Sequence, residues 1–154
     1  MYNPVVNQRL RIRMDSTDLK QAGLKTTLPR LRVLSILENS KVKHLSAEDV
    51  YKELLEEKES TGLATVYRVL TQFEDAGLVI RHNFEGDRSV FELNDEGHHD
   101  HMVCVKCGKV IEFFDKRIEL QQDKVAESHD FFIQDHSLTL YGLCKNCRDK
   151  QPEI

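Results

Sequence analysis

The stretch Leu63–Leu93, LATVYRVLTQFEDAGLVIRHNFEGDRSVFEL, decides the fold of the first part of this 154-residue chain. Its first half places apolar residues at helical spacing from Leu63 to Phe73, and Gly77 ends the predicted helix. Its second half contains two extended segments, 78–84 and 88–93, joined by a short glycine-containing connection typical of a hairpin. A helix followed directly by a hairpin is the pattern that ends a winged helix-turn-helix.

Two further helices are predicted upstream of this stretch. The first begins near Leu28 and accepts Pro29 at its start, and the second is capped by Ser46 with Asp49 three residues on. Three helices and a hairpin favour an N-terminal winged helix-turn-helix DNA-binding domain, and a small α+β domain without nucleic-acid function is the alternative. The apolar positions expected to face inward are Leu28, Leu31, Leu34 and Leu37, then Ala47, Val50, Tyr51, Leu54 and Leu55.

The polar stretch Asn94–Gly97 is the expected domain boundary. Beyond it, segments 100–105, 110–114 and 137–143 are predicted strands, and Asp115 is expected to cap a helix. About 60 residues form a small core on their own, so we expect a metal and oligomerisation to stabilise this part. The predicted fold class is α+β. Its parts are a basic N-terminal extension (1–17), a winged-helix DNA-binding domain (18–94) and a small α/β metal-binding dimerisation domain (95–154).

Charge is distributed unevenly along the chain, although the net charge is only −4. Residues 1–32 contain seven Lys/Arg against two Asp/Glu, whereas residues 94–154 contain eight basic against twelve acidic residues. A local basic region suffices for phosphate contacts even in an acidic protein. No stretch approaches a membrane span and the N-terminus does not resemble a secretory signal, so a cytoplasmic protein is expected.

All four cysteines of the chain fall into two Cys-x-x-Cys pairs, Cys104/Cys107 and Cys144/Cys147. In a protein of the cytosol such pairs bind metal more often than they form disulfides. Four thiolates form a closed tetrahedral shell, which indicates a structural zinc ion rather than a catalytic one. A redox-active dithiol is the alternative.

Three histidines within four positions precede the first cysteine pair and indicate further metal sites. Because side chains alternate along a strand, His99 and His101 should face one way, and His98 and Asp100 the other. Such imidazole and carboxylate ligands suit Fe(II), Mn(II), Co(II) or Zn(II). Isolated surface histidines are the simpler interpretation, and we apply it to His82 and His129. Candidate partners are Glu92 and Glu112 for the His99/His101 pair, and Glu119 and His136 for the His98/Asp100 pair.

The third predicted helix presents Thr65, Arg68 and Gln72, flanked by Tyr67, on the face opposite its apolar residues. Such side chains contact bases and phosphates when a helix enters a major groove, although an ordinary solvated face has the same composition. The basic residues Arg9, Arg11, Arg13 and Lys25 are likewise compatible with a minor-groove arm or with solubility alone.

Several motifs in the same order resemble the ferric uptake regulator family from about Asp18 to Cys147. The resemblance implies a homodimeric winged-helix repressor, with tetramers as an alternative, that binds a palindromic double-stranded operator when loaded with metal. The motifs are Ala22–Lys25 with Pro29 and Arg30, Gly62–Leu70, Asn83–Gly86, His98–Cys107 and Gly108–Phe113.

By this resemblance, each metal-binding residue receives a role. His44, which spacing alone does not single out, joins Glu92, His99, His101 and Glu112 in a regulatory site. His98, Asp100, Glu119 and His136 form an auxiliary site, and the four cysteines hold structural zinc. Tyr67, Arg68 and Thr65 would contact DNA from the third helix, with Lys25 near the minor groove.

The resemblance also bears on the regulatory metal. Peroxide-sensing members use aspartates where this chain has Glu92 and Glu112, and zinc sensors use a cysteine that this chain cannot spare. We therefore expect Fe(II) and repression of iron-uptake genes, with a manganese or zinc sensor as the alternative. A non-haem metalloenzyme is a rival from another class, but five ligands would fill its coordination shell.

Overall fold

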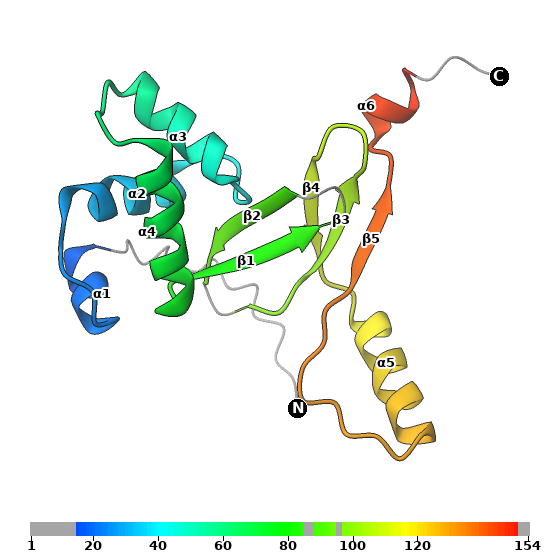
Figure 1. Ribbon diagram of the computed structural model, residues 1–154. Coiled ribbons are helices and arrows are strands. Elements are labelled where there is room, and N and C mark those ends of the chain that lie inside the picture. The colour runs from blue at the N-terminus through cyan, green and yellow to red at the C-terminus, as the bar shows by residue number, and fades with distance from the viewer. Residues whose placement is uncertain (1–14, 85–87, 95–96, 151–154) are drawn as a thin grey trace. The chain divides into compact units, whose positions relative to one another are not determined.

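The computed structural model describes residues 15–84, 88–94 and 97–150 of the chain, which form two compact units (Figure 1). The first unit holds the described residues up to Asn83 together with Arg88–Asn94, and the second holds Phe84 and residues 97–150. Within these ranges, no helix combines the length and the apolar character needed to cross a membrane.

The described part of the first unit consists of four helices and a two-stranded sheet (Figure 1). The sequence predicted three of the helices and both strands, and the short α1 is an addition. Six residues are too few to show a helical period, and α1 begins at a capping box in which Asp15 accepts from the backbone of Thr17 and Asp18 caps in return. The elements are α1 (Ser16–Gln21), α2 (Leu28–Asn39), α3 (Ala47–Glu56), α4 (Leu63–Asp75), β1 (Val79–Phe84) and β2 (Arg88–Leu93).

The predicted helix boundaries of this unit have clear local causes. Ser46 accepts from the backbone N–H of Asp49 at 3.1 Å, and the Asp49 carboxylate accepts from the Ser46 N–H at 2.9 Å. At the end of α4, Gly77 has a φ of +76°, a conformation that glycine adopts without strain. Arg9, Arg11 and Arg13, the basic part of the predicted extension, lie outside the described residues.

The core of the first unit is apolar and continuous across α2, α3, α4 and the sheet. Two of the expected core positions were wrong: Leu28 is 60% exposed and Leu55 is 52% exposed. A repeat of three residues drifts around a helix of 3.6 residues per turn, so α2 buries Val33 and Ile36 rather than Leu28. The buried residues of α3 and α4 are Ala47, Val50, Leu54, Val66, Val69, Leu70 and Phe73.

A single backbone bridge ties the segment before α3 to the sheet. Leu45 and Phe91 exchange both backbone hydrogen bonds, at 3.0 and 2.7 Å. His44 precedes Leu45 and Glu92 follows Phe91, so the bridge brings His44 next to Glu92. Along the chain, 47 residues lie between these two positions.

In the second unit, residues 97–150 form a three-stranded sheet with two helices (Figure 1). Its strand order is β4-β3-β5, with β3 antiparallel to β4 and parallel to β5. Asp115 caps α5 as predicted, by accepting from the backbone of Arg117 at 2.8 Å. The short α6 was not predicted. The elements are β3 (Asp100–Cys104), β4 (Val110–Phe113), α5 (Lys116–Ser128), β5 (Thr139–Gly142) and α6 (Lys145–Arg148).

This unit buries few apolar side chains. Helix α5 has no buried residue, and Phe131 and Phe132, which follow it, are 69% and 83% exposed. A large exposed apolar surface on a small unit indicates that another surface covers it in the functional protein. Further exposed apolar residues of the unit are Leu120, Val125, Leu140, Tyr141 and Leu143.

Candidate metal centres and nucleic-acid interface

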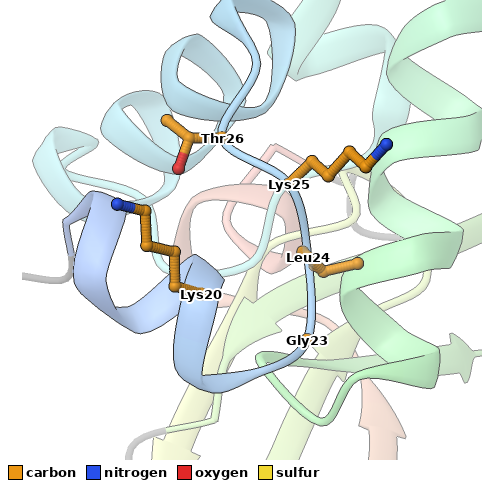
Figure 2. Close-up of a pocket in the computed structure, with 5 residues that line it drawn as sticks. All are labelled: Lys20, Gly23, Leu24, Lys25 and Thr26. Atoms are coloured by element: carbon orange, nitrogen blue, oxygen red, sulfur yellow. The ribbon is translucent and has the colours of Figure 1, made fainter.

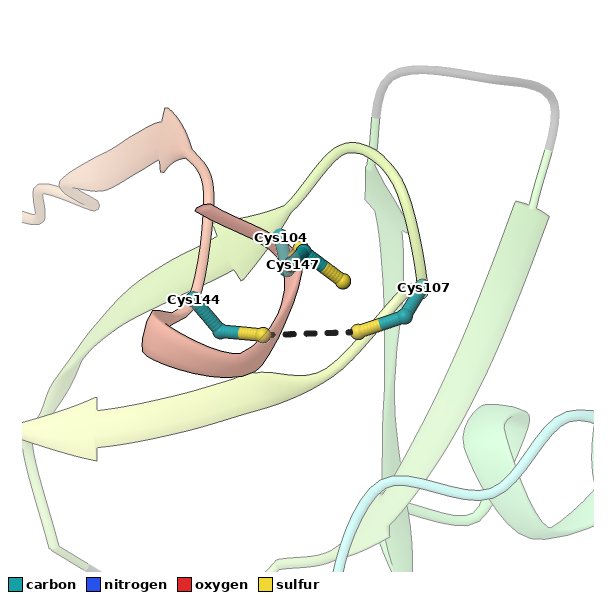
Figure 3. Close-up of side chains that lie close together, drawn as sticks. All are labelled: Cys104, Cys107, Cys144 and Cys147. Atoms are coloured by element: carbon teal, nitrogen blue, oxygen red, sulfur yellow. Dashed lines mark hydrogen bonds between the residues drawn. The ribbon is translucent and has the colours of Figure 1, made fainter. Parts of the chain in front are cut away.

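The four cysteines converge at one end of the second unit (Figure 3). Cys104 ends β3, Cys107 lies in the turn before β4, Cys144 caps α6, and Cys147 lies within α6. Their sulfur atoms all lie within 4.8 Å of one another, and the Cys107 and Cys144 sulfurs are 3.8 Å apart. Four thiolates bound tetrahedrally at about 2.3 Å from zinc are separated by roughly 3.8 Å. A redox-active dithiol requires only one Cys-x-x-Cys pair, whereas here the two pairs lie together in one cluster. This arrangement favours a metal site.

The backbone around the cysteines prepares Cys104 to act as a thiolate. N–H groups of Cys144 and Cys107 donate to its sulfur and lower the pKa of Cys104 to about 6. Burial, followed by the neighbouring thiols, raises the pKa of Cys147 to about 12. Four negative sulfurs therefore repel one another unless a cation lies between them, which is the condition that a divalent metal satisfies.

The predicted auxiliary ligands form a second cluster in the same unit. His98 Nε2 lies 3.5 Å from Asp100 Oδ1 and 3.3 Å from Glu119 Oε1, and His136 Nε2 lies 3.0 Å from Glu119 Oε2. Asp100 is fully buried, and neither of its oxygens accepts a hydrogen bond from the described residues. A buried carboxylate needs a compensating charge, and a metal ion among these four side chains would supply it.

Three of the predicted regulatory residues meet on the other face of this sheet. His101 and Glu112 are register partners on β3 and β4, and His99 Nε2 lies 3.7 Å from Glu112 Oε1. The rings of His99 and His101 are 4.9 Å apart. His99 Nδ1 contacts the Gly97 carbonyl at 2.9 Å, so it carries the proton and leaves Nε2 available as a ligand atom.

The other two predicted regulatory residues meet in the first unit. His44 Nε2 lies 2.9 Å from one oxygen of Glu92, and His82 Nε2 lies 2.6 Å from the other. The interpretation of His82 as a solvated surface group was therefore wrong, because β1 and β2 pair and place its imidazole on the Glu92 carboxylate. His129 is exposed and contacts Val125 O and Ser128 Oγ, as a surface histidine would.

Helix α4 presents polar side chains on the surface of the first unit. Tyr67 is 43% exposed and Arg68 is exposed, while Thr65 is half-buried and accepts from Arg68 at 3.4 Å. The Tyr67 hydroxyl donates to the Glu48 carboxylate of α3, which lowers the pKa of Glu48 and raises the pKa of Tyr67. Glu48 therefore fixes the orientation of the exposed tyrosine ring.

The Gln72 side chain makes hydrogen bonds within the first unit. Its side-chain oxygen accepts from Arg30 Nε at 3.3 Å and Nη2 at 3.0 Å, which ties α4 to α2. Arg30 also donates to the carbonyl of Lys25 at 2.7 Å. The pattern of α4 alone does not show this helix-to-helix contact, and a DNA contact from Gln72 stays a prediction.

Lys25 lies beside a surface pocket between α1 and α2 (Figure 2). The chain turns into this loop at Gly23, whose φ of +79° is in the left-handed region. Lys20 and Lys25 both line the pocket, and their ammonium groups point to opposite sides of the loop (Figure 2). Two lysines on the basic part of the chain suit contact with phosphate. Its lining residues are Lys20, Gly23, Leu24, Lys25 and Thr26.

We predict that Arg68→Ala weakens operator binding by about 1–3 kcal/mol, roughly 5- to 150-fold, because a guanidinium on the exposed face of α4 would contact the major groove. Lys124→Ala on α5 is the matched control, since it removes the same charge from the second unit and should leave binding unchanged. Fluorescence anisotropy with a labelled operator measures both variants. Equal affinities of Arg68→Ala and the parent chain would show that α4 does not contact DNA.

The chain is similar to known proteins along most of its length. The chain matches the family model described as the ferric uptake regulator family over residues 21–141. It is 63% identical over 134 residues to a ferric uptake regulation protein of Legionella pneumophila, covering 87% of this chain and 98% of that protein.

Two solved structures are similar to the chain along most of its length. The ferric uptake regulator from Pseudomonas aeruginosa with manganese has a TM-score of 0.72 and 55% identity, and covers 86% of this chain and 98% of its own. The regulator from Francisella tularensis with iron has a TM-score of 0.78 and 44% identity, with coverages of 82% and 96%. The fold of the chain therefore has counterparts in ferric uptake regulators that were solved with manganese and with iron.

Proposed function

Since the chain belongs to the ferric uptake regulator family, a family of DNA-binding transcription regulators and not of enzymes, we propose that it is an Fe(II)-responsive repressor of iron-uptake genes. The observation that carries the proposal is the pair of half-formed ligand sets. His44 and Glu92 lie together in the first unit, and His99, His101 and Glu112 lie together in the second. These five residues provide imidazole and carboxylate donors suited to Fe(II).

We assign these five residues to one regulatory site. The ligands from the first unit fix one side of an ion and those from the second unit fix the other, so occupancy restrains the orientation of the two units. Without metal, the chain would sample several orientations, of which only some match a palindromic operator. A shift from mostly inactive to mostly active requires a differential of roughly 5 kcal/mol, which several metal–ligand bonds can provide.

The other two clusters have supporting roles. The four cysteines would hold a structural zinc ion that fastens the last segment of the second unit to the β3–β4 turn. His98, Asp100, Glu119 and His136 would hold an auxiliary ion, supported by the buried charge of Asp100. In each cluster a bound metal ion would act as a Lewis acid, and the side chains of the cluster would hold it in place as ligands.

The units divide the remaining roles. We assign residues 18–94 to DNA binding, through Thr65, Tyr67, Arg68 and Lys25, and residues 95–154 to metal binding and dimerisation. The exposed apolar residues around α5 and β5, above all Phe131 and Phe132, support a homodimer interface in the second unit, with pairing into tetramers as the alternative. A regulator that binds chromosomal DNA is expected in the cytoplasm.

The choice of Fe(II) rests on the ligand types. Glu92 and Glu112 are both glutamates, and all four cysteines meet in one cluster, so none remains for a thiolate-containing sensor site. Manganese stays the principal alternative because it favours similar oxygen and nitrogen ligands.

The proposal is tested by operator binding with Fe(II), Mn(II) and Zn(II) added in turn to chain that retains its zinc. We expect Fe(II), under anaerobic conditions, to raise the affinity for a palindromic promoter fragment by at least about 100-fold, within the range of strong coupling between sites. Gel-shift titrations measure it. If Mn(II) stimulates operator binding at a lower free concentration than Fe(II) does, the manganese alternative holds. Equal operator affinity with and without metal would rule out metal-dependent repression.

A further inference from the structure

We propose that His44, His82 and Glu92 form a three-ligand metal site contained within the DNA-binding unit, with His82 as a ligand that the regulatory set above lacks. The inference rests on the proposed function insofar as His44 and Glu92 belong to both. It adds that the first unit can hold a divalent transition-metal ion with its own side chains, before the second unit contributes any.

The geometry places two imidazoles on the two oxygens of one carboxylate. Glu92 Oε1 lies 2.6 Å from His82 Nε2, and Glu92 Oε2 lies 2.9 Å from His44 Nε2. The two rings are 5.8 Å apart between centroids and inclined by 56°. Ligand atoms bound at about 2.1 Å from one ion are separated by roughly 3 Å, which is close to the separation of these oxygens and nitrogens.

Two paired strands and one backbone bridge hold these side chains in place. His82 is on β1, Glu92 is on β2, and His44 precedes the bridge in which Leu45 and Phe91 exchange backbone hydrogen bonds. A site carried by paired strands keeps its geometry better than one carried by a loop. The triad therefore exists as a property of the first unit alone.

The arginine nearest in sequence to the triad does not compete for the Glu92 carboxylate. Side chains alternate along β1, so Arg81 points to the face opposite His82. Arg81 pairs with Glu74 of α4 at 3.0 Å and lies over the Phe91 ring at 5.0 Å, away from the triad. Arg81 therefore lies on the opposite face of the sheet from the Glu92 carboxylate, which contacts the two imidazoles instead.

Two histidines and one carboxylate are a recognised ligand set for Fe(II) that leaves coordination positions open. In this chain the open positions would be completed by His99, His101 and Glu112 when the regulatory site forms. The consequence is an order of events: the first unit captures the ion through three ligands, and closure onto the second unit follows.

Co(II) binding to the full-length, zinc-containing chain tests the triad. In the His99→Ala/His101→Ala background, we expect a Co(II) ion to remain at the triad, in addition to any at the auxiliary cluster. Adding His82→Ala or His82→Gln should remove one Co(II) per chain, with a loss of affinity of more than about 100-fold at that site, larger than the loss of an outer-shell partner causes. Adding His129→Ala instead is the matched control and should leave the Co(II) count unchanged.

Proton NMR of the Co(II) protein separates a ligand from a residue that only positions Glu92. Each bound imidazole gives a strongly shifted ring N–H signal, so His82→Gln should remove one such signal. Three results would overturn the proposal: loss of the ion already in the double variant, an unchanged Co(II) count after His82 substitution, or weaker binding with every shifted signal retained. Fe(II)-dependent operator binding of the parent chain, measured separately, shows whether the proposed function itself fails.

Discussion

Cys104→Ser should release the structural zinc ion and unfold the second unit at moderate temperature. A structural zinc site contributes binding free energy on the order of 10 kcal/mol to folding. The second unit has little else to replace it, since α5 buries no residue and only Val103 and Cys104 are buried apolar positions among its described residues. Backbone N–H groups of Cys144 and Cys107 lower the pKa of Cys104 to about 6, which favours its thiolate form as a metal ligand.

Metal analysis by mass spectrometry and thermal unfolding by circular dichroism measure the two effects. The first unit has its own apolar core, so part of the helical signal should persist after the second unit melts. The parent chain stripped with a chelator provides the comparison and should match the variant. Full zinc content with an unchanged melting curve would show that the cysteines hold no structural metal.

His99→Ala should abolish Fe(II)-stimulated operator binding while the chain stays folded and keeps its zinc. His99 Nε2 faces Glu112 at 3.7 Å, and its Nδ1 contacts the Gly97 carbonyl, so the ring is already oriented as a ligand. Loss of one ligand from the set in the second unit weakens the link between the units, and the affinity gained from Fe(II) should fall by roughly 100-fold. Basal binding without metal should stay as it is.

His129→Ala is the matched control for this variant, because it also removes an imidazole from the second unit but belongs to none of the ligand clusters. Gel-shift titrations with increasing Fe(II) compare the parent chain with both variants, and zinc content is measured alongside. If His99→Ala responds to Fe(II) at the same concentration as the parent chain, His99 is not a regulatory ligand.

Local patterns accounted for most of the secondary structure. The Ser46 capping box, the positive φ at Gly77 and the Asp115 cap depend on contacts between residues at most three apart, and these were predictable. The short helices α1 and α6 were missed because four to six residues cannot display a helical period. Leu28 was misplaced because a three-residue repeat departs from the helical turn of 3.6 residues.

Among the metal ligands, too, those with a local sequence pattern were predictable and those without one were not. Cys104/Cys107 and Cys144/Cys147 were found from spacing because each pair is local, and alternation along the strand separated His98 from His99. His44 and His82 carry no such spacing signal. Only the Leu45–Phe91 bridge and the pairing of β1 with β2 bring their imidazoles to the Glu92 carboxylate.

By itself, the sequence of Leu63–Leu93 determined a helix followed by two strands, because helix and hairpin formation depend on neighbours in the chain. Tertiary structure decided which side chains of that stretch are available for chemistry. In the folded unit, Gln72 accepts a hydrogen bond from Arg30, and Tyr67 is oriented by its hydrogen bond to Glu48. His82, expected at the surface, contacts the Glu92 carboxylate. The reason is physical: those contacts join positions 10 to 42 residues apart, and only packing of the folded unit brings such positions within a few ångströms.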